Sequence, residues 1–68
     1  MLTIELGKRI KELRKHTGLN QTEFSIKINM SRTYFADVEA GGRNIAIINL
    51  AKIAYGLDVS LSELFEGL

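Results

Sequence analysis

The stretch from Asn20 to Gly41 constrains the fold of this chain more than any other part of the sequence. Asn20 is a residue type that caps helices, and Glu23 stands three positions later, where it completes a capping box. A turn is expected at Asn29 and Met30, because asparagine is, after glycine, the residue that best tolerates the left-handed backbone of a tight turn. The stretch therefore predicts two short helices joined by a tight turn.

The second of these helices has two different faces. Ser31 can cap it, and Phe35 and Val38 have the spacing of an inward face. The outward face consists of Arg32, Thr33, Ala36 and Asp37. A helix in the DNA major groove needs such an arrangement, because one face must hold it to the protein while the other meets the base edges. The pattern therefore favours a DNA-reading helix-turn-helix.

The rest of the chain predicts three further helices. The first is expected from about Thr3 to His16, and Gly18 ends it. An apolar stripe predicts a fourth helix with the members Ile47, Leu50, Ile53, Ala54 and Leu57. Residues 60–63, Ser-Leu-Ser-Glu, form a second capping box that begins a short fifth helix. We expect an all-α fold, a compact five-helix bundle with the helix-turn-helix at helices 2 and 3, in a single domain spanning residues 1–68.

Composition and charge narrow the classes of function. The chain has no cysteine and one histidine, and its carboxylates lack metal-ligand spacing, so we expect no enzyme, no metal site and no cofactor. No apolar run approaches membrane-spanning length and no signal peptide is evident, so a cytoplasmic protein is expected. Residues 1–43 carry eight basic against five acidic side chains, whereas residues 44–68 carry one against three. The basic part contains the predicted helix-turn-helix, as a surface that faces phosphate requires.

Motifs along nearly the whole chain resemble those of one family. They are Gly7–Arg14, Gly18–Phe24, Ser31–Tyr34, Glu39, Gly41, Arg43–Asn44, Leu50–Ala54 and Leu57–Phe65. With these motifs the chain resembles the phage-repressor and Cro-like helix-turn-helix family, also called the XRE class, whose fold is the lambda-repressor-like DNA-binding domain. Within that family, Ser31–Tyr34 followed by Glu39, Gly41 and Arg43–Asn44 looks most like the controller proteins of restriction-modification systems.

The resemblance implies a function and leaves alternatives open. It implies a sequence-specific transcription regulator that binds a pseudo-palindromic double-stranded DNA operator as a homodimer and regulates its own operon. A regulator of this class that activates would also contact an RNA polymerase subunit. The alternatives are a phage or stress-circuit repressor of the same class, and an antitoxin-like module that docks a protein partner.

The resemblance also assigns DNA contacts to individual residues. The base-reading positions are Arg32, Thr33, Tyr34 and Ala36, and the phosphate-binding positions are Gln21, Arg43 and Asn44. Several of them have structural alternatives. Gln21 can be an exposed helix starter, and Asn44 can cap the fourth helix. The Tyr34 phenol can contact a phosphate instead of a base, or it can support Arg32 from the side. Asp37 either accepts from a cytosine amine or pairs with a neighbouring cation such as Arg32.

Two further sets of residues have structural roles. Members of the family commonly join the first and third helices through an Arg-Glu pair, which falls on Arg14 and Glu39 here. The tail carries more apolar groups than a chain of 68 residues readily hides, so we expect a symmetric homodimer through the fourth and fifth helices. Its predicted contacts are Ile45, Ile47, Ile48, Leu61, Leu64 and Phe65. The alternative is that these residues only complete the core of the monomer.

Overall fold

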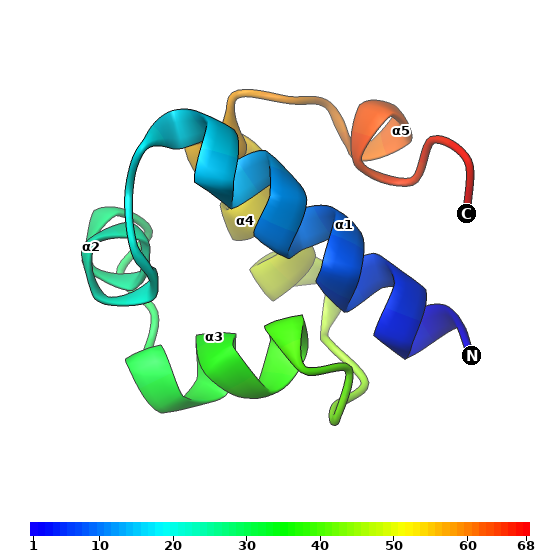
Figure 1. The fold of residues 1–68 in the computed structure, drawn as a ribbon, viewed down its shortest axis with the longest axis horizontal. Helices are drawn as coiled ribbons and strands as arrows, with labels where there is room; N and C mark the ends of the chain where they lie inside the picture. Colours follow the sequence, from blue (N-terminus) through cyan, green and yellow to red (C-terminus); the bar gives the residue numbers. More distant parts are fainter.

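Five helices make up the fold, and the computed structural model describes all 68 residues (Figure 1). They are α1 (Leu2–Thr17), α2 (Gln21–Lys27), α3 (Arg32–Glu39), α4 (Ile47–Leu57) and α5 (Leu61–Leu64). The long α1 packs against α3 and α4, while α2 packs against α3 and the short α5 against α4. The predicted all-α, five-helix class is confirmed. No helix is both long and apolar enough to span a membrane.

Short-range signals in the sequence set the ends of the first three helices. Gly18 ends α1 in the left-handed conformation, with a φ of 80°. The Asn20 side chain accepts from the Glu23 N–H at 2.8 Å, and the Glu23 carboxylate accepts from the Asn20 N–H at 2.9 Å. Asn29 adopts the left-handed turn conformation with a φ of 55°, and the Ser31 side chain caps α3. These predictions from the sequence are confirmed.

The last two helices begin in different ways. Ser60 and Glu63 form the predicted reciprocal capping box of α5. Hydrogen bonds from the backbone N–H and the side chain of Ser60 hold the pKa of the Glu63 carboxyl below its ordinary value. In contrast, α4 begins after Ala46 with no side-chain cap, so the alternative role of Asn44 as that cap is wrong. Asp58 ends α4 in the left-handed conformation, which the sequence pattern did not predict.

All five helices contribute to the core. Its buried apolar residues are Leu6, Ile10, Phe24, Ile28, Phe35, Val38, Leu50, Ile53, Ala54, Leu57 and Leu64. The rings of Phe24 and Phe35 lie 5.1 Å apart between their centroids, which holds α2 and α3 together. Leu64 has no exposed surface within the single chain, so its predicted role as a dimer contact is wrong. Because α5 is only four residues long, the buried Leu64 and the half-buried Leu61 together anchor it to the core.

Candidate nucleic-acid interface

One side of α3 is free of the core. Phe35 and Val38 hold the helix in place, and both are at most 3% exposed. Arg32 and Thr33 in its first turn are exposed, whereas Ala36 is half-buried. The Arg32 guanidinium takes part in none of the ion pairs of the chain. Its donors are therefore free to meet the two acceptors that a guanine presents in the major groove.

The loop after α3 brings a cation back to the helix. The chain turns sharply at Gly41, which has a φ of 78°. A 3.0 Å hydrogen bond from the Gly42 N–H to the Asp37 carbonyl closes the turn. Arg43 Nη2 then lies 3.5 Å from a carboxylate oxygen of Asp37, and both side chains are about half exposed. Asp37 thus pairs with a cation, but the predicted partner Arg32 is wrong, because residues five apart on a helix point about 140° apart.

Tyr34 supports Arg43 and not Arg32. The guanidinium carbon of Arg43 lies 4.7 Å from the centroid of the Tyr34 ring, a distance typical of a cation-π contact. In addition, Asn49 Nδ2 donates to the Tyr34 hydroxyl oxygen at 3.1 Å. Sequence reasoning missed Asn49, and no local signal marks it, because only the tertiary fold brings the start of α4 to the side of α3.

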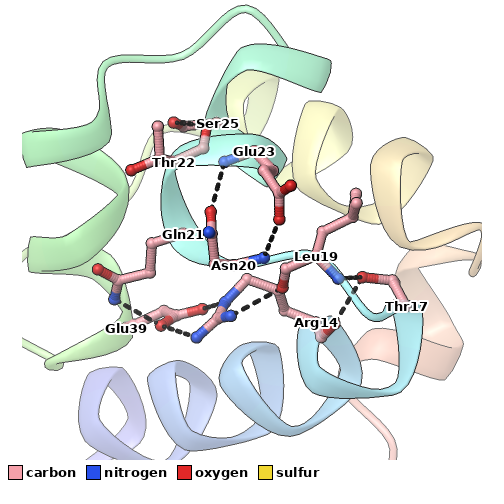
Figure 2. Close-up of polar contacts among 9 residues, drawn as sticks. All are labelled: Arg14, Thr17, Leu19, Asn20, Gln21, Thr22, Glu23, Ser25 and Glu39. Atoms are coloured by element: carbon pink, nitrogen blue, oxygen red, sulfur yellow. Dashed lines mark hydrogen bonds and ion pairs between the residues drawn. The ribbon is translucent and has the colours of Figure 1, made fainter.

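A buried polar network joins the first three helices (Figure 2). Arg14 Nε and Nη2 bind the two carboxylate oxygens of Glu39 at 2.7 and 3.2 Å. Arg14 Nη1 donates to the Leu19 carbonyl at 3.0 Å, and Gln21 Nε2 donates to Glu39 Oε1 at 2.8 Å. Arg14 is only 8% and Glu39 only 7% exposed. The predicted Arg14–Glu39 pair is present, and it fixes how α3 sits on α1.

Gln21 has a structural role that was not predicted. Figure 2 shows its side chain reaching from the start of α2 to the Glu39 carboxylate, and the residue is half-buried. The alternative of a free, exposed helix starter is therefore wrong. The amide keeps a second N–H and its carbonyl oxygen for another partner, because the hydrogen bond to Glu39 uses one N–H. Asn44, the third predicted phosphate contact after Gln21 and Arg43, is exposed in the loop.

The predicted dimer contacts outside the core fall into two groups. Ile47 and Ile48, at the start of α4, are 64% and 70% exposed. Ile45, Leu61 and Phe65 are half-buried and pack against the core, so they complete the monomer more than they offer a free surface. Among the predicted dimer contacts, Ile47 and Ile48 therefore provide most of the exposed apolar surface.

Comparison with known proteins places this arrangement in a family. Residues 10–64 match the family model described as Helix-turn-helix. The control protein C.MunI of Mycoplasma sp is 44% identical over 66 residues, which cover 96% of this chain and 89% of that protein. The chain belongs to this helix-turn-helix family, the class of phage repressors and Cro, and within it to the restriction-modification controller proteins. The family is one of DNA-binding regulators and not of enzymes.

Two solved controller proteins share the fold. The restriction-modification controller protein C.AhdI of Aeromonas hydrophila superposes with a TM-score of 0.89 at 36% identity, over 93% of this chain and 91% of that chain. The controller protein C.Esp1396I was solved as a tetramer in complex with its natural 35-base-pair operator. It superposes with a TM-score of 0.88 at 35% identity, over 97% of this chain and 87% of that chain.

Proposed function

We propose that this protein is the controller of a restriction-modification system, which binds a pseudo-palindromic operator as a homodimer and regulates its own operon. The observation that carries the proposal is the exposed, unpaired Arg32 at the start of α3, on a helix that the buried Arg14–Glu39 pair holds rigidly. Similarity to controller proteins over almost the whole chain supports the restriction-modification context. One domain would serve both DNA binding and dimerisation, in the cytoplasm where the operator lies.

Three side chains of α3 suit base recognition. The Arg32 guanidinium can pair bidentately with guanine O6 and N7, and the neighbouring Thr33 offers a hydroxyl or a methyl group. Ala36 lies one turn further along and is half-buried, so its methyl group suits close contact with a thymine methyl. The polar character of the outward positions distinguishes this helix from that of a protein-docking module, which would present apolar residues there.

Backbone contacts would flank the reading helix. Gln21 lies at the start of α2, and Arg43 and Asn44 lie in the loop after α3. Contacts to phosphate fix the register of a protein on DNA without reading its sequence. Gln21 can bind a phosphate oxygen while Glu39 holds it, because its second N–H is unused.

The start of α4 would carry the dimer contact. Full burial of an isoleucine side chain contributes about 1.5 to 3 kcal/mol, and both Ile47 and Ile48 are largely exposed in the single chain. A two-fold symmetric contact there would present two copies of α3 about 34 Å apart, the spacing of successive major grooves. The tetramer that C.Esp1396I forms on its operator supports binding by more than one copy. An activating complex would also contact an RNA polymerase subunit.

Substituting Ile48 tests the dimer. Ile48→Asp is expected to give a folded monomer, because the side chain is 70% exposed and its loss leaves the core intact. Sedimentation equilibrium measures the mass, and circular dichroism verifies the fold. Ile26→Asp is a matched control, because Ile26 is 74% exposed on α2, outside the proposed contact. A dimer that survives Ile48→Asp, or that the control also dissociates, would contradict this interface.

Substituting Arg32 tests base reading. Arg32→Ala is expected to weaken operator binding by about 1 to 3 kcal/mol and to relax the base preference at one position in each half-site. Binding selections with the variant and the wild type measure both effects. Lys15→Ala, which removes one exposed cation from α1, should leave the preference unchanged. An equal loss on every sequence would instead show that Arg32 binds phosphate.

Binding to the DNA upstream of its own coding sequence tests the proposed regulation. Purified protein should bind that duplex at least tenfold more tightly than a duplex of the same composition with shuffled sequence, when both are measured at the same salt concentration. Equal affinity for the two duplexes would contradict regulation of its own operon.

A further inference from the structure

We propose that Asn49 is a positioning residue for DNA binding: through Tyr34 it aligns Arg43, so that the Tyr34 hydroxyl and the Arg43 guanidinium bind one phosphate group of the DNA backbone. This inference rests on the proposed DNA-binding function and adds a residue of α4 to it. It also favours a phosphate contact of Tyr34 over base reading.

The bond to Asn49 fixes how the Tyr34 hydroxyl can act. Asn49 Nδ2 donates to Tyr34 Oη at 3.1 Å, in a half-buried site between α3 and α4. A phenol has one O–H donor and two acceptor lone pairs, and Asn49 occupies one of the lone pairs. The hydroxyl proton therefore points to another partner. Tyr34 is held as a hydrogen-bond donor, and an anionic oxygen is the partner that gains most from such a donor.

The same bond determines where Arg43 lies. The face of the Tyr34 ring carries the guanidinium, whose carbon is 4.7 Å from the ring centroid. The other contact of Arg43, to Asp37, is long at 3.5 Å and about half exposed to solvent, so it holds the cation weakly. If the ring rotates, Arg43 loses its support. The position of Arg43 thus depends on Asn49, although the two side chains belong to different segments of the chain.

The arrangement suits phosphate better than a base edge. The Tyr34 hydroxyl is tied to the first turn of α4 and so lies back from the outward side of α3, where Arg32 and Thr33 stand. The Asp37 contact uses a single nitrogen of Arg43, Nη2, and an arginine has five N–H donors. The remaining Arg43 donors and the Tyr34 O–H thus form a cluster of hydrogen-bond donors beside a positive charge. A phosphate group, with its several acceptor oxygens and its negative charge, is the partner that matches.

Salt-dependent binding of a random-sequence 35-base-pair duplex tests the inference, because phosphate contacts do not depend on sequence. Asn49→Ala is expected to lower the affinity about three- to tenfold and to reduce the slope of log K against log salt by about 0.9, the value for one lost phosphate contact. Tyr34→Phe, which removes the hydroxyl and keeps the ring, is expected to lower the affinity to a similar extent. Melting curves verify that each variant is folded.

A double-mutant cycle separates positioning from a general loss of stability. In the Tyr34→Phe background, Asn49→Ala should cause little further loss, because the hydroxyl through which Asn49 acts is already absent. Additive losses or an unchanged salt slope would overturn the inference. So would a loss confined to one base position in a binding selection. If the wild-type protein fails to bind the duplex at low salt, the proposed function fails as well, which distinguishes the two results.

Discussion

Replacing Glu39 with alanine is expected to destabilise the fold by about 3 to 5 kcal/mol, because it leaves the buried Arg14 guanidinium without a counter-ion. Gln21 loses its acceptor in the same variant, so the hydrogen bond from α2 to α3 is lost as well. A domain of 68 residues has a total unfolding free energy of roughly 3 to 10 kcal/mol. The loss is thus comparable to the whole stability. Circular dichroism should show a large fall in Tm or no cooperative transition.

A double variant separates the stranded charge from a merely lost contact. Arg14→Met combined with Glu39→Leu removes both charges and fills the site with apolar groups, so it should be more stable than Glu39→Ala alone. Where it is folded, the double variant should keep the wild-type base preference, because both side chains are buried and neither is a proposed base-reading position. A Glu39→Ala melting curve that matches wild type would contradict this account of the network.

Gly7→Ala is expected to have the second largest effect. It should lower the free energy of unfolding by about 3 kcal/mol, the upper end of the usual cost of overpacking a core. A Cβ atom on Gly7 would lie 2.5 Å from the backbone oxygens of Val38 and Glu39. Because those atoms belong to the backbone, α1 would have to move away from α3. In an unhindered helix, the same substitution stabilises by about 1 kcal/mol, so the sign of the change in Tm reports on the contact.

Gly42→Ala is the matched control for this close approach. A Cβ atom there would meet only the Asp37 carbonyl oxygen at 3.8 Å, an ordinary van der Waals contact, and Gly42 is not among the residues with positive φ. Its Tm should therefore stay near that of wild type. A Gly7→Ala variant that melts at or above the wild-type temperature would show that α1 and α3 are not so close.

The sequence predicted the elements whose signals are local. Capping boxes act between residues three apart, so Asn20 with Glu23 and Ser60 with Glu63 could be recognised without knowledge of the fold. The left-handed turn at Asn29 could be predicted for the same reason, since it depends on the tolerance of one residue. Local chemistry of this kind sufficed to place the helices and the outward face of α3.

The predictions that were wrong or missing concern residues whose contacts depend on the tertiary fold. Whether Leu64 faces a second copy or the core depends on how α5 docks, and the apolar pattern is the same in both cases. Asp37 pairs with Arg43 because a glycine turn reverses the chain, while charge alone also allowed Arg32. The bond from Asn49 to Tyr34 exists because the tertiary fold brings the start of α4 to the side of α3, which no short-range pattern encodes.

Selection of bound sequences from a random double-stranded DNA library is the most direct test of the central claim, that α3 reads an operator in a symmetric complex. We expect to recover an inverted repeat with half-sites about one helical turn apart. Each half-site should contain one guanine whose selection is lost in Arg32→Ala. Recovery of no motif, with binding that disappears uniformly as salt is raised, would contradict it and would favour a module that docks a protein partner.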